Sequence, residues 1–228
     1  MYCTVAAGKA AAMIQQKVEV RFEKSEALRF ISHHDLMRAF QRAVRRAGLP
    51  IRLTEGFNPR PRIVFPVALE VGVASLDEAA EIELVQCMTT QEVARRLSST
   101  LPPGLVLRTI KELPPSRTAQ TPLRLLYRLH LQAAGIPVAA PDVQKLLDAK
   151  TLPFARLREK RTQDVDLRPA LLEASLEPSG DLLIAVRPSP KGSARPLELL
   201  SVLLRTPLEE LKSVRVTKLR MDLSPLPT

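Results

Sequence analysis

The hydrophobic period of the chain changes near residue 32, and this change constrains the fold more than any other feature. In the preceding stretch, KVEVRFEK, the residues Val18, Val20 and Phe22 alternate with charged residues, which is typical of a half-buried β-strand. In the stretch that follows, apolar residues recur every three to four positions, which predicts an amphipathic helix. A strand followed directly by a helix indicates a domain of mixed α and β structure.

The predicted helix has clear signals at both ends. Ser32 is a good N-cap, and Asp35 follows at the spacing of a capping box. Gly48 is suited to end the helix because glycine adopts the left-handed conformation of a C-terminal cap. The apolar residues that share one face of the helix are Leu36, Phe40, Ala43 and Ala47.

Similar patterns continue along the chain and predict the element order β-α-β-β-α-β twice. This order is ferredoxin-like. We therefore expect an α+β protein of two tandem ferredoxin-like (βαββαβ) domains, at residues 17–113 and 123–222. The proline-flanked residues 114–122 are interpreted as a linker, and residues 1–16 and 223–228 as tails, the first of them flexible.

The charge balance predicts a polyanionic partner. The chain has 34 Lys and Arg residues against 24 Asp and Glu residues, which gives a formal net charge of +10. Such a balance favours nucleic acid, here RNA, as the partner. No apolar run approaches the roughly 20 residues that a membrane helix needs, so we expect no membrane association. Two isolated cysteines fit a reducing cytoplasm and predict no disulfide framework.

Arginines dominate the polar face of the predicted helix. Arg38, Arg42 and Arg45 form a row, Arg46 lies beside it, and Asp35 is the nearest acid on that face. An ordinary solvated face would mix Glu with Lys. Guanidinium groups match the geometry of phosphates, so this row is either a phosphate-binding surface or a solvated face.

The sequence GFNPRPR adds a second basic segment stiffened by two prolines. Arg60 and Arg62 belong to it, and Phe57 is either a stacking platform for a base or a core residue of a rigid loop. Together the two segments give a predicted nucleic-acid-binding set, which consists of Arg29, Arg38, Arg42, Arg45, Arg46, Phe57, Asn58, Arg60 and Arg62.

His33 is the single candidate for a catalytic residue. A neutral imidazole in the first turn of a helix can act as a general base, but base catalysis needs a positioned partner that the sequence does not identify. The alternative is a capped helix start with one of His33 and His34 packed and the other solvated. The sequence contains no metal-ligand spacing, so we expect no metal and no cofactor.

The stretches RFISHHDLMRAFQRAVRRAGLP, EGFNPRPRIVFPVALEVGV and DVDLRP resemble the radical SAM-linked protein family. That family is a bacterial domain of unknown function, found alone or fused behind cobalamin-binding-type radical SAM proteins. The resemblance implies a link to radical SAM systems, although the chain has no three-cysteine cluster motif of its own. The residues that carry it are Arg29, Ser32, His33, Asp35, Arg38, Gly56, Phe57, Asn58 and Pro59.

Three functional hypotheses follow. The first is an RNA-binding or RNA-modification accessory protein. The second is a metal-independent endoribonuclease with His33 as base, for which a looser likeness to CRISPR repeat-processing endoribonucleases rests on the two-domain architecture. The third is a protein–protein module that docks on a separate radical SAM enzyme.

Overall fold

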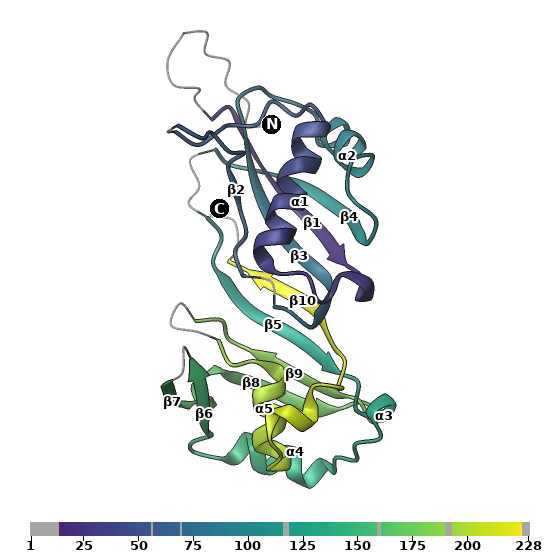
Figure 1. Ribbon diagram of the computed structural model, residues 1–228, viewed down its shortest axis with the longest axis vertical. Coiled ribbons are helices and arrows are strands. Elements are labelled where there is room, and N and C mark those ends of the chain that lie inside the picture. The colour runs from purple at the N-terminus through teal and green to yellow at the C-terminus, as the bar shows by residue number, and fades with distance from the viewer. Residues whose placement is uncertain are drawn as a thin grey trace. The chain divides into compact units, whose positions relative to one another are not determined.

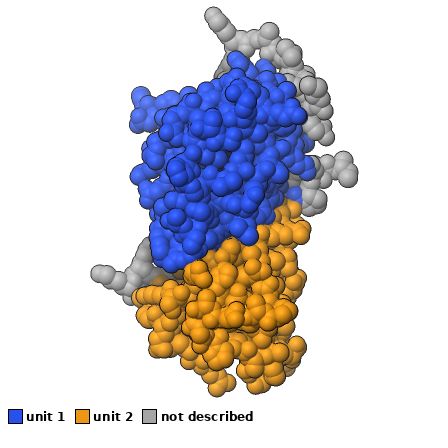
Figure 2. All heavy atoms as spheres, turned by 90° about the vertical axis from the view of Figure 1, so that its right-hand side faces the viewer, with its two compact units in different colours: residues 1–121, 224–228 blue, residues 122–223 orange. Residues whose placement is uncertain are grey.

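The structure is a computed structural model that describes residues 14–55, 57–68, 70–115, 119–158, 161–189 and 193–224. The chain divides into two compact units, coloured separately in Figure 2, which comprise residues 1–121 with 224–228 and residues 122–223. Most of the predicted tail at residues 1–16 lies outside the described residues, but Gln16 already belongs to the first strand.

The first unit packs two helices against an antiparallel sheet (Figure 1). β1 pairs antiparallel with both β3 and β4, and the short strand β2 pairs with the other side of β3, which gives the order β4-β1-β3-β2. Its elements are β1 (Gln16–Lys24), η1 (Glu26–Leu28), α1 (His33–Arg46), β2 (Ile63–Val64), β3 (Val73–Leu84), α2 (Thr90–Ser98) and β4 (Leu105–Leu113).

The core of this unit lies between α1 and the sheet, as the sequence pattern predicts. Val18, Val20 and Phe22 of β1 are fully buried together with Leu36 and Phe40 of α1. The rings of Phe22 and Phe40 lie 5.2 Å apart between centroids. Burying an apolar side chain of this size contributes roughly 1.5–3 kcal/mol, so this contact fixes which face of α1 points outward.

The face of β1 opposite its apolar residues is also buried, which corrects the prediction of a half-buried strand. Lys17 and Glu19 are only 3% and 7% exposed, although their positions alternate with the apolar ones. Lys17 Nζ lies 2.7 Å from Glu81 Oε2, and the backbone N–H of Gln120 donates to Glu81 Oε1 at 2.7 Å. Buried charges need such partners, and here Gln120, from the segment predicted as a linker, supplies part of them.

The second unit holds a four-stranded antiparallel sheet and a separate hairpin. The sheet has the order β10-β5-β9-β8, and β6 pairs only with β7 in the described residues. Its elements are β5 (Pro122–Leu129), α3 (Leu131–Ala134), α4 (Ala140–Asp148), β6 (Pro153–Arg158), β7 (Arg161–Asp166), η2 (Arg168–Ala170), β8 (Leu171–Leu176), β9 (Leu182–Val186), α5 (Pro196–Leu204), η3 (Leu208–Leu211) and β10 (Val216–Leu223).

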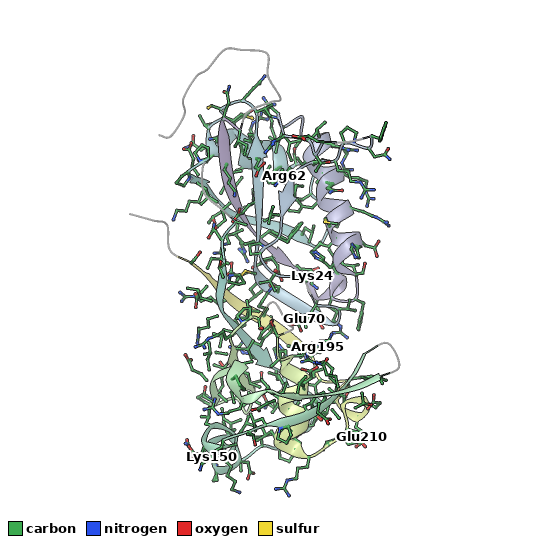
Figure 3. All side chains as sticks on the ribbon, turned by 90° about the vertical axis from the view of Figure 1, so that its left-hand side faces the viewer. Lys24, Arg62, Glu70, Lys150, Arg195 and Glu210 are labelled. Atoms are coloured by element: carbon green, nitrogen blue, oxygen red, sulfur yellow. The ribbon has the colours of Figure 1, made fainter. Side chains whose placement is uncertain are left out.

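A buried ion pair joins the hairpin to α5. The Arg156 guanidinium on β6 lies 2.5 Å from Glu198 Oε2 and donates a further hydrogen bond to Ser193 O at 3.1 Å. Glu198 also accepts the backbone N–H of Arg195, the N-cap of α5, at 2.9 Å; Figure 3 labels Arg195.

The helices and strands of both units make the protein α+β, with antiparallel pairing inside each unit.

Candidate nucleic-acid interface

Helix α1 presents its arginines because its ends and its apolar face are fixed. Ser32 Oγ accepts the backbone N–H of Asp35 at 3.1 Å, as the predicted N-cap requires. Gly48 follows the helix with φ of 60°, the left-handed conformation that ends it. Since the apolar face is buried against the sheet, Arg38, Arg42 and Arg45 are exposed on the outer side.

The second basic segment is the tip of a narrow loop, residues 54–60, hereafter the tip segment. The backbone N–H of Thr54 donates to Arg60 O at 2.8 Å, and Thr54 Oγ1 accepts the N–H of Arg60 at 3.0 Å. Leu53 and Pro61 form an antiparallel bridge directly behind these bonds. The loop is therefore closed at its base. Gly56 lies outside the described residues.

The two segments meet. The Arg45 guanidinium donates from Nη2 to the carbonyl oxygen of Pro59 at 3.2 Å, so α1 and the tip segment are in direct contact. Between them lies an open pocket of about 560 Å³, hereafter the arginine pocket, which is lined by Arg38, Gln41, Arg45, Asn58, Pro59 and Arg60.

The arginine pocket carries little compensating negative charge. Arg38 approaches Asp35 at 3.7 Å, and both side chains are exposed, so this ion pair contributes little. In the parts of the chain that the structure describes, no carboxylate lies within ion-pair distance of Arg42, Arg45 or Arg60. The pocket is therefore an electropositive hollow with guanidinium groups on two sides.

The remaining predicted arginines lie elsewhere. Arg29 pairs with Glu26 and stacks over the ring of Phe30 at 4.5 Å. Arg46 donates from Nη2 to Thr100 O at 2.5 Å, and Arg62, labelled in Figure 3, pairs through Nε with Glu83 Oε2 at 3.1 Å. These three residues do not line the arginine pocket, and neither does Arg42, which is exposed on α1.

The exposure of Phe57 decides whether it is a core residue of a rigid loop, one of the two alternatives that the sequence left open. Its side chain is as exposed as a free residue, at 106%, so the interpretation as a core residue is wrong. Asn58 and Pro59, which follow it directly, line the arginine pocket. Phe57 therefore directly precedes two pocket residues in the chain, although its own side chain does not line the pocket.

His33 and His34 differ as one packed and one exposed residue. The ring of His33 meets Phe65 edge-on with centroids 5.6 Å apart, whereas His34 is exposed. Burial lowers the pKa of His33, the adjacent His34 lowers it further, and Glu78 acts in the opposite direction. His33 is therefore mainly neutral at neutral pH, but it does not line the arginine pocket.

Glu78 is the residue near His33 that the sequence reasoning missed. It is 2% exposed on β3, where it alternates in step with the buried residues Ala80, Ile82 and Leu84. A carboxylate at an apolar position of a strand is the signal that could have found it. Lys24, at the end of β1, is a second buried charged residue that the sequence reasoning missed. Its Nζ donates to Glu70 O at 3.0 Å (Figure 3).

The comparisons with known proteins place this chain in one family. Residues 17–197 match the model of a family described as an uncharacterized protein conserved in bacteria, DUF2344. The chain belongs to this family. A search of the curated proteins found no match.

The DUF2344 match covers both segments of the arginine pocket and extends through the second unit into α5. Within it, the DVDLRP motif has a structural role. Asp166 Oδ1 accepts the backbone N–H groups of Leu152 and Arg168, and these bonds lower the pKa of Asp166. The Arg168 guanidinium donates to the carbonyl oxygens of Leu147 and Ala149 at the end of α4.

Two features are absent from the described residues. These residues contain no cluster of three or more His, Cys, Asp or Glu side chains arranged to hold a metal ion. They also contain no helix that is long and apolar enough to cross a membrane.

Proposed function

We propose that this chain is an RNA-binding or RNA-modification accessory protein, and that the arginine pocket holds the phosphates of the RNA. The observation that carries the proposal is the contact between Arg45 and Pro59, which brings guanidinium groups of two separate segments around one hollow. A helix face used only for solubility has no need of such convergence.

The chemistry of the pocket supports a phosphate ligand. Arg38, Arg45 and Arg60 supply planar, permanently charged donors that match phosphate oxygens, and the Asn58 side chain adds both a donor and an acceptor. The guanidinium groups repel one another in the free protein. A bound phosphodiester offsets this repulsion, and the release of its counterions favours binding at low salt.

The test is a charge-reversed variant that carries Arg38→Glu and Arg45→Glu in the pocket and Arg42→Glu beside it on α1. We expect it to lose retention of RNA, and the slope of log affinity against log salt to decrease by about 2 if three single-strand phosphate contacts are lost. Affinity and slope are measured by fluorescence anisotropy over a range of salt concentrations. Unchanged RNA binding contradicts the proposal.

A matched control carries the same change of charge at exposed arginines that already have acidic partners. These are Arg95 with Glu92, Arg108 with Glu23 and Arg220 with Asp222. The control variant keeps the net charge of the test variant, so it separates binding at the pocket from a general effect of charge. Circular dichroism melts verify that both variants fold.

The finer features of the molecule are part of the same proposal. The strand orders β4-β1-β3-β2 and β10-β5-β9-β8 support two ferredoxin-like units, the second with β6 and β7 inserted. We place the protein in the cytoplasm as the partner of a radical SAM enzyme acting on RNA. Affinity purification followed by ribonuclease treatment tests this link: a radical SAM partner retained after treatment indicates direct docking, the third hypothesis.

The lowered pKa of His33 favours metal-independent RNA cleavage as a second candidate function. A neutral imidazole next to the buried carboxylate Glu78 has the protonation state that a general base requires. Labelled RNA incubated with the protein and a chelator tests it, with His33→Ala as the variant and His34→Ala as the control. Absence of cleavage that depends on His33 rejects the enzyme.

A further inference from the structure

An exposed aromatic side chain directly precedes two residues of the arginine pocket, Asn58 and Pro59. Phe57 is fully exposed, which is unusual for a phenylalanine because leaving its ring in water forgoes about 1.5–3 kcal/mol of burial. An exposed aromatic ring close in the chain to cationic groups is an arrangement on which single-stranded nucleic acid can stack its bases.

The chain segments on both sides of the tip are hydrogen-bonded to each other and to α1. The tip segment is closed at its base by the Thr54–Arg60 bonds, and behind them the N–H of Arg62 donates to Arg52 O at 2.9 Å. On the helix side, the Arg45 guanidinium holds the carbonyl of Pro59. Phe57 therefore directly precedes residues of the arginine pocket, on a loop whose base is already closed, so ordering it on a ligand costs less entropy.

We infer that the ligand of the arginine pocket is an unpaired nucleotide segment, a single strand or a loop, whose base stacks on Phe57 while its phosphates lie against the arginines. This inference rests on the proposed function and specifies its substrate. Base faces inside a duplex are covered by their neighbours, so a duplex offers phosphates to the arginines and nothing to the ring. A single strand offers both at once.

The experiment compares a single-stranded RNA of about 12 nucleotides with the blunt duplex of the same sequence, both carrying 2-aminopurine. The chain contains no Trp, so the fluorescence of this base is read without protein background. We expect tighter binding of the single strand, with quenching of 2-aminopurine. We expect Phe57→Ala to weaken single-strand binding about tenfold, as for loss of one base–aromatic stack, and to abolish the quenching.

Three controls complete the design. Phe57→Tyr keeps a stacking ring and should retain affinity and quenching. Phe30→Ala removes another exposed aromatic ring, 67% exposed and outside the arginine pocket, and should change neither. A single-stranded DNA of the same sequence shows whether stacking is shared by both nucleic acids.

The outcomes separate this inference from the proposed function. Equal affinity of the wild-type protein for single strand and duplex, or equal losses for both on Phe57→Ala, overturns the inference and leaves RNA binding in place. Absence of binding to either RNA overturns both. Single-strand binding that is unaffected by Phe57→Ala also overturns the inference and leaves RNA binding in place.

Discussion

The arginine pocket and the interior of the second unit use the same side chain in opposite ways. Arg45 and Arg60 face an open hollow, without a carboxylate within ion-pair distance among the described residues. Arg156 is buried and forms two hydrogen bonds with Glu198, at 2.8 Å and 2.5 Å. The net charge of the chain does not distinguish these roles, since it counts each arginine equally.

The two regions differ in whether their arginines already have partners within the protein, and this difference indicates which arginines are available to a ligand. In the second unit, Arg128 binds both carboxylate oxygens of Glu177, at 2.6 Å and 2.8 Å, and Arg168 is occupied by backbone carbonyl groups. Such arginines stabilise the fold and are not available to a ligand. Only arginines without these partners can bind phosphate strongly, so we expect opposite effects of mutation in the two regions.

The largest effect is expected at the buried ion pair. Glu198→Ala leaves the Arg156 guanidinium buried without its partner and also removes the bond that caps α5, so we expect a loss of about 3–5 kcal/mol. Urea unfolding followed by circular dichroism measures it. The contrast with the pocket is tested by Arg38→Ala, which should change stability by less than about 0.5 kcal/mol and weaken RNA binding.

A double substitution distinguishes loss of the pair from loss of packing. Arg156→Met combined with Glu198→Leu replaces both charges by apolar groups, and we expect it to recover part of the stability lost in Glu198→Ala. If Glu198→Ala unfolds at the same urea concentration as the wild type, the pair does not stabilise the unit and the comparison fails.

A smaller effect is expected at Arg168. Its guanidinium donates to three backbone carbonyl groups, those of Leu147, Ala149 and Leu171, each at 3.0 Å. Arg168→Ala should cost about 2 kcal/mol, because hydrogen bonds to charged groups contribute roughly 1.5–3 kcal/mol. Thermal melts measure the loss, and RNA binding by the folded protein should be unchanged.

Arg168→Lys sharpens this prediction because it keeps the charge and removes the planar fork. A single ammonium group cannot reach three carbonyl groups in different directions, so we expect less than half of the lost stability to return. Full recovery by lysine indicates that charge at this position is sufficient and that the geometry of the guanidinium is not needed.

The sequence predicts α1 well because the signals are local. Ser32 caps the helix, Gly48 ends it, and Leu36 and Phe40 fall on the buried face, as the helical period requires. Local patterns also fix which arginines share the outer face. This information is enough to state the phosphate-binding hypothesis.

The contacts that assemble the site are not local, and the sequence does not specify them. Nothing in the pattern states that the Arg45 side chain reaches Pro59, or that Arg62 pairs with Glu83 on β3 and so does not line the pocket. The buried Lys17 was missed for the same reason, since alternation shows that a strand has two faces but not what covers the second.

The smallest predicted effect concerns pH and lies on the same helix as the pocket. Burial lowers the pKa of His33, so the unfolded chain binds this proton more tightly than the folded one. The folded state is therefore favoured fully above the ordinary histidine pKa of 6.5, and part of that stability is lost as the pH falls through this value. The loss is small because the ring remains partly exposed.

Urea unfolding at pH 7.5 and pH 5.5 measures this loss as a decrease in the free energy of unfolding. The decrease should be smaller for His33→Gln than for the wild type, whereas His34→Gln should retain most of the wild-type decrease. Equal decreases in all three proteins contradict the assignment and remove the half-buried, neutral imidazole on which the endoribonuclease alternative depends.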